Sequence, residues 1–238
     1  MDETGITNVL KPEKIIATKS KRQFLKITSG ERGATVAIVC AMSASGTYVP
    51  PFFIFPRKRM TDRLAVGAPS GSIIRVSSSG WTDSSLFIEW LTHFVAATYA
   101  PKTNEQSIVL DGHHSHKTLE AINFCRDNGI YLITLPPRCT HKMQHLDRTF
   151  FKPLKVGYNT AASNWMLSHQ GRRFSFFDMA GIFATAYNFT ANIDKAINGF
   201  RCSGLYPIND LIFNNEAFEA ALLTNEAEPL KICNVKTM

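Results

Sequence analysis

The sequence lacks the features that mark secreted, membrane-spanning and disulfide-stabilised proteins. Its five cysteines are widely scattered and include no C-x-x-C pair, so we expect reduced thiols in an intracellular protein. No apolar run approaches the roughly 18 residues of a transmembrane helix. The opening stretch MDETGITNVL has neither the basic nor the apolar region of a signal peptide. These absences predict a globular protein without a membrane span.

What is present is enough apolar material for one substantial core, and an excess of positive charge. The chain has 238 residues, of which 45% are hydrophobic, and this predicts one main domain. The net charge of +7 favours polyanionic partners, nucleic acid first. The alternative is a basic protein with no such partner.

The order of periodic segments predicts an α/β fold. β-Branched runs predict a hairpin over 34–59 that turns at Gly46, with a bulge or an edge at Pro50 and Pro51, and a strand within 71–81. Apolar residues at helical spacing then predict a helix over 83–100, with Asp83 as its N-cap. The remaining expected elements are a strand at 106–112, a helix at 117–129, a strand at 130–137, and helices at 147–169, 175–191 and 192–200. We therefore expect a mixed sheet, antiparallel early and parallel late.

Three acids stand where a metal ion could use them. Asp111 ends a buried strand, and functional groups in open α/β sheets gather at such ends. Asp147 opens a helix, and Asp2 lies at the start of the chain. Hard divalent cations prefer carboxylate ligands, and two such ions can drive phosphodiester chemistry. Each acid also has an ordinary interpretation: Asp147 as an N-cap, Asp111 as a turn residue and Asp2 as a frayed terminal residue.

Histidines accompany two of these acids and leave two further interpretations open. A zinc site is one, but cysteine pairs and an H-E-x-x-H motif are both missing. A Ser–His–Asp hydrolase is the other, but no G-x-S-x-G motif is present. The residues concerned are His113, His114, Ser115, His116, His141 and His145. A role in shaping the loop or in hydrogen bonding near phosphate is the simpler expectation.

Four motifs in order carry a family resemblance: MDETG, VLDGHHSH, LPPRCTHKMQHLDRTFFKPLK and GFRCSGLYPIN. Together they resemble the DDE-superfamily endonuclease domain of pogo/Tigger/jerky-type transposases and proteins derived from them. The resemblance implies a ribonuclease H-like mixed sheet flanked by helices, with a helical C-terminal part. It also implies Mg²⁺- or Mn²⁺-dependent cleavage and strand transfer of DNA. Asp2, Asp111 and Asp147 match the catalytic, metal-binding acids, and His116 and Gln144 match supporting residues.

Two departures from the family pattern are Gly112, where Asn is common, and His145, where Pro is common. Only Met1 precedes Asp2, so we expect the first strand to be truncated. The expected division is a DDE-type domain over 1–210 and a partly helical tail over 211–238. A catalytically inactive, domesticated DNA-binding or protein-interaction module is the alternative.

The resemblance also implies partners and a location. DNA is the expected partner, a homo-oligomer is a further expectation, and the nucleus is the expected compartment. Basic residues that could contact phosphates form two runs, with a solvated surface as the alternative for each run. They are Lys21 and Arg22 in the first run, and Arg57, Lys58 and Arg59 in the second.

Overall fold

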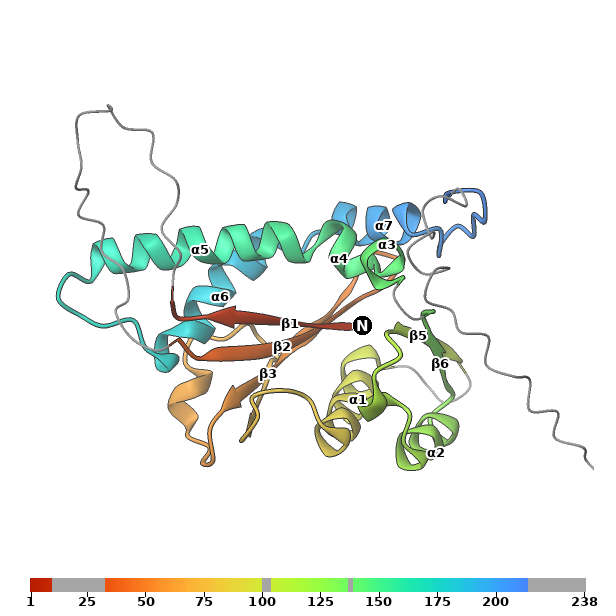
Figure 1. Ribbon diagram of the computed structural model, residues 1–238, viewed down its shortest axis with the longest axis horizontal. Helices are drawn as coiled ribbons and strands as arrows, with labels where there is room; N and C mark the ends of the chain where they lie inside the picture. The colour runs from red at the N-terminus through yellow and green to blue at the C-terminus, as the bar shows by residue number, and fades with distance from the viewer. Residues whose placement is uncertain (10–32, 100–103, 137–138, 214–238) are drawn as a thin grey trace, which may run out of the picture.

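The computed structural model describes residues 1–9, 33–99, 104–136 and 139–213 (Figure 1). Lys21 and Arg22, and the helix expected in the C-terminal tail after residue 213, lie outside the described residues. The division into a domain over 1–210 and a tail stays a prediction.

A four-stranded sheet forms the centre of the fold, in the order β1-β2-β3-β4. β1 and β2 pair antiparallel, as do β2 and β3, whereas β4 runs parallel to β3. Antiparallel pairing of the early strands and parallel pairing of the later ones agree with the prediction. The strands are β1 (Asp2–Thr7), β2 (Thr35–Met42), β3 (Tyr48–Pro56) and β4 (Ile73–Ser77).

The predicted hairpin between β2 and β3 is confirmed in its turn and in its irregularity. Gly46 has a φ of 99°, which a residue with a side chain would adopt only under strain. The register shifts between Val39 and Ala41, opposite Pro50 and Pro51. Prolines cannot donate to a ladder, so β3 accommodates them through this shift while remaining an inner strand.

A second sheet pairs β5 (Gln106–Leu110) with β6 (Ile130–Thr134) in parallel. α2 (Leu119–Asp127) connects these two strands, and α1 (Ser84–Thr98) precedes them. The predicted N-cap of α1 is confirmed, since the Asp83 carboxylate accepts a hydrogen bond of 2.9 Å from the Leu86 N–H. The two sheets meet where the Met1 nitrogen donates a 2.5 Å hydrogen bond to the Val109 carbonyl.

The C-terminal half of the described chain is helical. The predicted helix over 147–169 is split in two at Phe150, which follows the last residue of α4 and precedes the first residue of α5. These helices are α3 (Thr140–Met143), α4 (His145–Thr149), α5 (Phe151–Ser168), α6 (Phe176–Thr190) and α7 (Ile193–Cys202). Two short 3₁₀ helices, η1 (Asp62–Ala65) and η2 (His114–His116), lie in connections.

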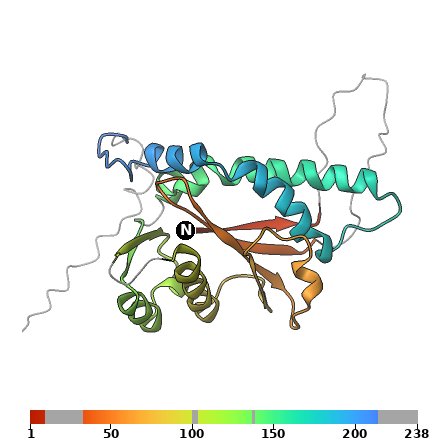
Figure 2. The ribbon, with the colours of Figure 1, turned by 180° about the vertical axis from the view of Figure 1, so that it is seen from behind.

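Helices cover both faces of the sheet, and alternating side chains of the strands divide the core accordingly (Figures 1 and 2). Ile38 and Phe53 pack with α5 and α6 on one face, as Leu154 and Phe183 show. Val39, on the other face, packs with α1, α2 and the second sheet. The predicted mixed sheet flanked by helices is therefore confirmed.

The first strand, which we expected to be truncated, begins at Asp2 itself. β1 runs forward from Asp2 to Thr7, and Asp2 lies opposite Cys40 in the ladder with β2. The single residue before Asp2 makes the one strand-like contact with β5, at Val109. Asp2 therefore stands on a strand paired along one side.

Candidate active site

Asp2 lies on the face of the sheet that α5 and α6 cover. Successive side chains of a strand point to opposite faces, so Asp2, Thr4 and Ile6 share a face. The carboxylate accepts a 2.8 Å hydrogen bond from the Glu3 N–H. Burial, followed by the charge of Asp147, raises the Asp2 pKa from 3.8 to about 7, and Asp111 adds to the effect. The charges of both other predicted acids therefore raise the pKa of Asp2.

Asp111 follows the last residue of β5 and is held in an ionised form. His116 Nδ1 lies 3.0 Å from Asp111 Oδ1, an ion-pair distance without hydrogen-bond alignment. The His113 N–H donates a 3.3 Å hydrogen bond to the same oxygen. The polar contact with His116 lowers the pKa of Asp111, and its charge and the His113 N–H add to this. Packing fixes the His116 ring, whose centroid lies 4.5 Å from that of Phe87.

Asp147 lies inside the short helix α4, and Gln144 is the N-cap of that helix. The N-cap interpretation of Asp147 is therefore wrong. Partial burial raises the pKa of Asp147, and the charge of Lys155 opposes this. α4 packs closely against α7 at Gly199, where a Cβ atom would lie only 3.0 Å from the His145 carbonyl oxygen. The Thr149 hydroxyl also donates a 2.8 Å hydrogen bond to the Lys195 carbonyl.

The main chain of Met1 links the three segments that carry the acids. Its nitrogen donates to Val109, two residues before Asp111. Its carbonyl accepts a 3.1 Å hydrogen bond from the side chain of Gln144, three residues before Asp147. Asp2 follows directly. Sequence patterns cannot reveal this junction, since it uses backbone atoms of the residue next to the motif.

The junction gives Gln144 a testable structural role. Gln144 is 0% exposed, so replacing it by alanine removes a buried hydrogen bond and leaves a void. We expect Gln144→Ala to lower the free energy of unfolding by about 1–3 kcal/mol, measured by urea denaturation. The exposed Gln170 provides the control, and Gln170→Ala should unfold as the wild type does. Equal stability of the two variants would contradict the role of this link.

The donor set suits a hard divalent cation better than a soft one. Asp2 and its two acidic neighbours raise the local negative potential, and a cation would relieve the repulsion that raises the pKa of Asp2. Within the part of the chain that the structure describes, no three His, Cys, Asp or Glu side chains form a ready-made metal cage. Mg²⁺ typically takes one or two carboxylates and completes its shell with waters and substrate phosphates. The acids fit that pattern.

Comparison with known families decides the assignment. The model of the DDE superfamily endonuclease family matches residues 32–203, a span that includes Asp111 and Asp147. The chain belongs to the DDE superfamily endonuclease family. The resemblance that the four sequence motifs carried is thereby confirmed at the level of the family.

Three curated relatives are each 25–26% identical in sequence to this DDE-family chain. A Cochliobolus lunatus protein named MFS-type transporter clz9 is 26% identical over 228 residues, which cover 94% of this chain and 24% of the relative. The human pogo transposable element with KRAB domain is 26% identical over 168 residues, and its mouse counterpart 25%. Each of these alignments covers 70% of this chain and 27% of the relative. The chain thus spans about a quarter of the length of these relatives.

Among solved structures, the chain is similar to complexes of the Mos1 transposase. The paired-end complex with the left transposon end gives a TM-score of 0.45 at 8% identity, covering 80% of this chain and 54% of that one. The strand transfer complex gives 0.46 at 10% identity, covering 83% and 52%. No described helix is both long and apolar enough to cross a membrane.

The histidines of the DDE-family chain do not form the alternative sites. His113 Nδ1 lies 2.8 Å from the Ser115 hydroxyl, whereas Asp111 contacts His116, so Ser, His and Asp are not connected in series. His145 is buried against Phe200, with ring centroids 4.4 Å apart. Burial lowers the pKa of His145 well below its usual value. The hydrolase interpretation is not supported, and His145 is a packing residue where the family often has proline.

The role of His116 can be tested through the carboxyl beside it. We expect His116→Ala to raise the pKa of Asp111 towards its ordinary value, because the contact that lowers it is removed. NMR titration of the carboxyl carbon measures this. His114→Ala is the matched control, since His114 is exposed on the same short helix. An Asp111 pKa that is the same in both variants would refute the coupling.

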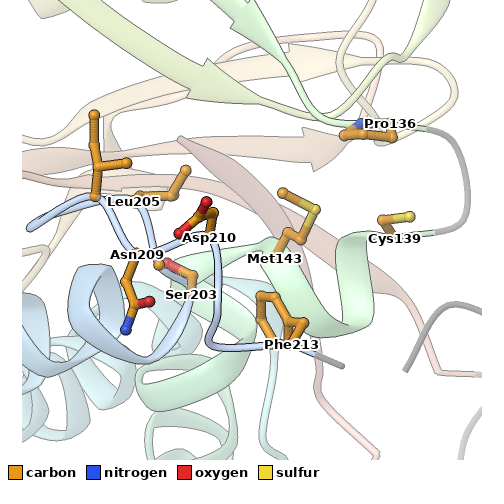
Figure 3. A pocket seen from close by; sticks show the side chains of 10 residues that line it. Pro136, Cys139, Met143, Ser203, Leu205, Asn209, Asp210 and Phe213 are labelled. Carbon is orange, nitrogen blue, oxygen red and sulfur yellow. The ribbon is translucent and has the colours of Figure 1, made fainter. Parts of the chain in front are cut away.

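Two cavities border the segments that hold the acids. One, of about 410 Å³, lies where β5 and β6 end and is lined by Asp111, Lys117 and Thr140 among others. The other, of about 420 Å³, is mostly apolar and lies between the start of α3 and the loop after α7. Figure 3 shows Cys139 and Met143 facing Asp210 there. The first cavity adjoins an ionised acid and a lysine, so it suits a polar ligand. The second cavity is lined in part by the loop of the GFRCSGLYPIN motif.

The structure places the predicted basic run far from the acids. Thr7 pairs with Thr35, and Ile54 lies opposite Ala37, so the end of β3 lies at the Thr7 end of β1. Arg57, Lys58 and Arg59 directly follow β3. At about 3.3 Å per residue, the six residues of β1 span about 17 Å, and the run also lies two strands away across the sheet, so it is more than about 17 Å from Asp2. The run therefore does not line the acidic centre.

Proposed function

We propose that this chain cleaves DNA phosphodiesters with the help of a divalent cation. The observation that carries the proposal is the junction at Met1, whose main chain bonds to Val109 and to Gln144 and so brings the segments of Asp111 and Asp147 to Asp2. Burial and the charges of Asp147 and Asp111 raise the pKa of Asp2 to about 7, in agreement with this arrangement. Asp2 thus lies close enough to each of the other two acids for their charges to raise its pKa. Acids in such an arrangement repel each other unless a cation or a proton is shared among them.

The residues that would hold the cation are Asp2 and Asp111, with Asp147 as the third carboxylate. A bound Mg²⁺ or Mn²⁺ pair would polarise the scissile phosphate and activate the attacking hydroxyl. The chain's own contribution is to keep the carboxylates in position and in the right charge state. The contact with His116 favours the ionised form of Asp111, whereas burial and the charge of Asp147 favour the protonated form of Asp2 up to near-neutral pH. A bound cation would favour the ionised form of Asp2.

The proposed substrate is DNA, in keeping with the positive net charge and with the pogo relatives. The cavity beside Asp111 provides Lys117 as a cation for a phosphate group. We further propose a nuclear location and assembly as a homo-oligomer, both from membership of the family. Because the chain spans about a quarter of its curated relatives, strand transfer and target choice are proposals for the longer proteins.

Nicking of supercoiled plasmid by the purified protein tests the proposal. We expect conversion to the open circular form in Mg²⁺ or Mn²⁺ and none in EDTA. Absence of nicking with both cations, while salt-sensitive DNA binding persists, would overturn the proposed activity and favour a binding module that has lost catalysis.

A further inference from the structure

Basic and aromatic side chains gather at the end of the sheet opposite Asp2. Arg57, Lys58 and Arg59 follow β3, and Arg63 lies on η1 nearby. The guanidinium groups of Arg57 and Arg63 lie over the Phe177 ring, 5.3 and 4.3 Å from its centroid. We call these five residues the distal basic surface.

The three residues at the start of α6 organise this region. The Phe176 ring packs on Phe55 with a centroid distance of 6.2 Å, which anchors the helix to the sheet. Phe177 supports the two arginines, and Asp178 pairs with Arg172 at 2.7 Å. Since Asp178 also accepts from Ser175, its charge is already engaged and does not neutralise the distal basic surface.

The cations of the distal basic surface have no carboxylate partners among the described residues. The salt bridges found there join Arg75 to Glu89, His116 to Asp111 and Arg172 to Asp178. Lys58, Arg59 and Arg63 are exposed, and Asp62 is the acid beside them in the chain. Exposed arginines that stack on a ring instead of pairing with an acid keep their charge available and lose less freedom on binding a polyanion.

The position of this surface relative to the acids sets the length of ligand that could reach both. Asp2 and α5 share a face of the sheet, and α5 runs alongside β1 towards the distal end (Figure 1). The separation of at least about 17 Å corresponds to at least about five phosphate spacings of ~3.4 Å on one DNA strand. A duplex with one phosphate at the acids would thus have to extend by at least about half a turn before its backbone could reach the distal basic surface.

We propose that the distal basic surface is a second DNA-backbone site, which holds the flanking duplex at least about five nucleotides from the phosphate at the acids. This inference rests on the proposed function for its substrate. The surface would bind phosphates without reading bases, and so would contribute affinity and orientation while leaving the chemistry to the carboxylates.

The salt dependence of DNA binding tests this site. Fluorescence anisotropy with a 30-base-pair duplex, at several salt concentrations, compares the wild type with Arg59→Ala/Arg63→Ala. We expect at least about tenfold weaker binding at low salt, and a slope of log K against log salt that is shallower by about 2, since each phosphate contact contributes about 0.9. Arg126→Ala/Arg201→Ala removes the same charge from exposed residues elsewhere and should keep the wild-type slope.

A variant that keeps the charge separates the stacking from the net charge. Phe177→Leu leaves every arginine in place but removes the ring, so we expect weaker binding than the wild type. Thermal unfolding of each variant verifies that it is folded. If the two double variants bind alike, or if Phe177→Leu binds as the wild type does, the distal site is refuted. If wild-type protein nicks plasmid in that case, the proposed function stands without the distal site; if it neither binds nor nicks DNA, both fail.

Discussion

Asp111→Asn is expected to reduce the cation-dependent nicking rate by at least about 100-fold. The estimate is a lower bound, because changing even an outer partner of a metal ligand typically costs about 10–100-fold. Among the three acids, Asp111 should show the largest loss of activity. The contact with His116 lowers its pKa, so it is ionised at neutral pH. Asparagine keeps the shape of the side chain but lacks the charge that a cation requires.

The initial rate of plasmid nicking in Mg²⁺ or Mn²⁺ measures this effect. Asp127→Asn is the matched control, because Asp127 is exposed at the end of α2 and away from the acids. It should nick as the wild type does. Nicking by Asp111→Asn at the wild-type rate would show that the observed cleavage does not depend on this centre.

Asp2→Asn is expected to make the protein more stable than the wild type at pH 8 in cation-free buffer. Burial and the neighbouring acids raise the Asp2 pKa from 3.8 to about 7. Between these values the folded protein keeps a proton that the unfolded chain releases, so wild-type stability falls as the pH rises. At about 1.4 kcal/mol per pH unit, the loss has an upper limit of about 4 kcal/mol. Asparagine carries no charge and escapes it.

Urea denaturation between pH 4 and pH 8 measures the difference, which should grow through this window and level off above pH 7. Saturating Mg²⁺ should restore stability to the wild type but not to Asp2→Asn, because a ligand that binds the folded state stabilises it. Asp127→Asn should follow the wild-type curve. A wild type that is as stable as Asp2→Asn at pH 8 without cation would show that the ionised Asp2 carboxylate does not destabilise the folded protein.

Much of the fold could be predicted from the sequence because its determinants are local. The apolar face of α1 with Asp83 at its start, and Gly46 between two β-branched runs, depend on residues a few positions apart. The parallel pairing of β4 with β3 depends on how distant segments meet, and no local pattern encodes it. At the split between α4 and α5, Phe150 packs on Tyr48 of β3, a contact between distant segments that no local pattern encodes either.

The candidate site follows the same division. The motifs pointed to Asp111 and Asp147 as residues, but the choice of partner for each was not in the sequence. Three histidines stand near Asp111, and only the fold shows that His116 contacts the acid while His113 contacts Ser115. The link from Gln144 to Met1 joins residues 143 positions apart through a backbone carbonyl, which has no sequence pattern.

Binding of Mn²⁺ measured by titration calorimetry tests most directly whether the acids form one cation centre. We predict that the wild type and Asp127→Asn bind with the same affinity, and that Asp2→Asn and Asp111→Asn each bind at least about tenfold more weakly. Binding by the wild type should also release protons near pH 7, since Asp2 must give up its proton. Equal affinity in all four proteins, without proton release, would contradict a shared site.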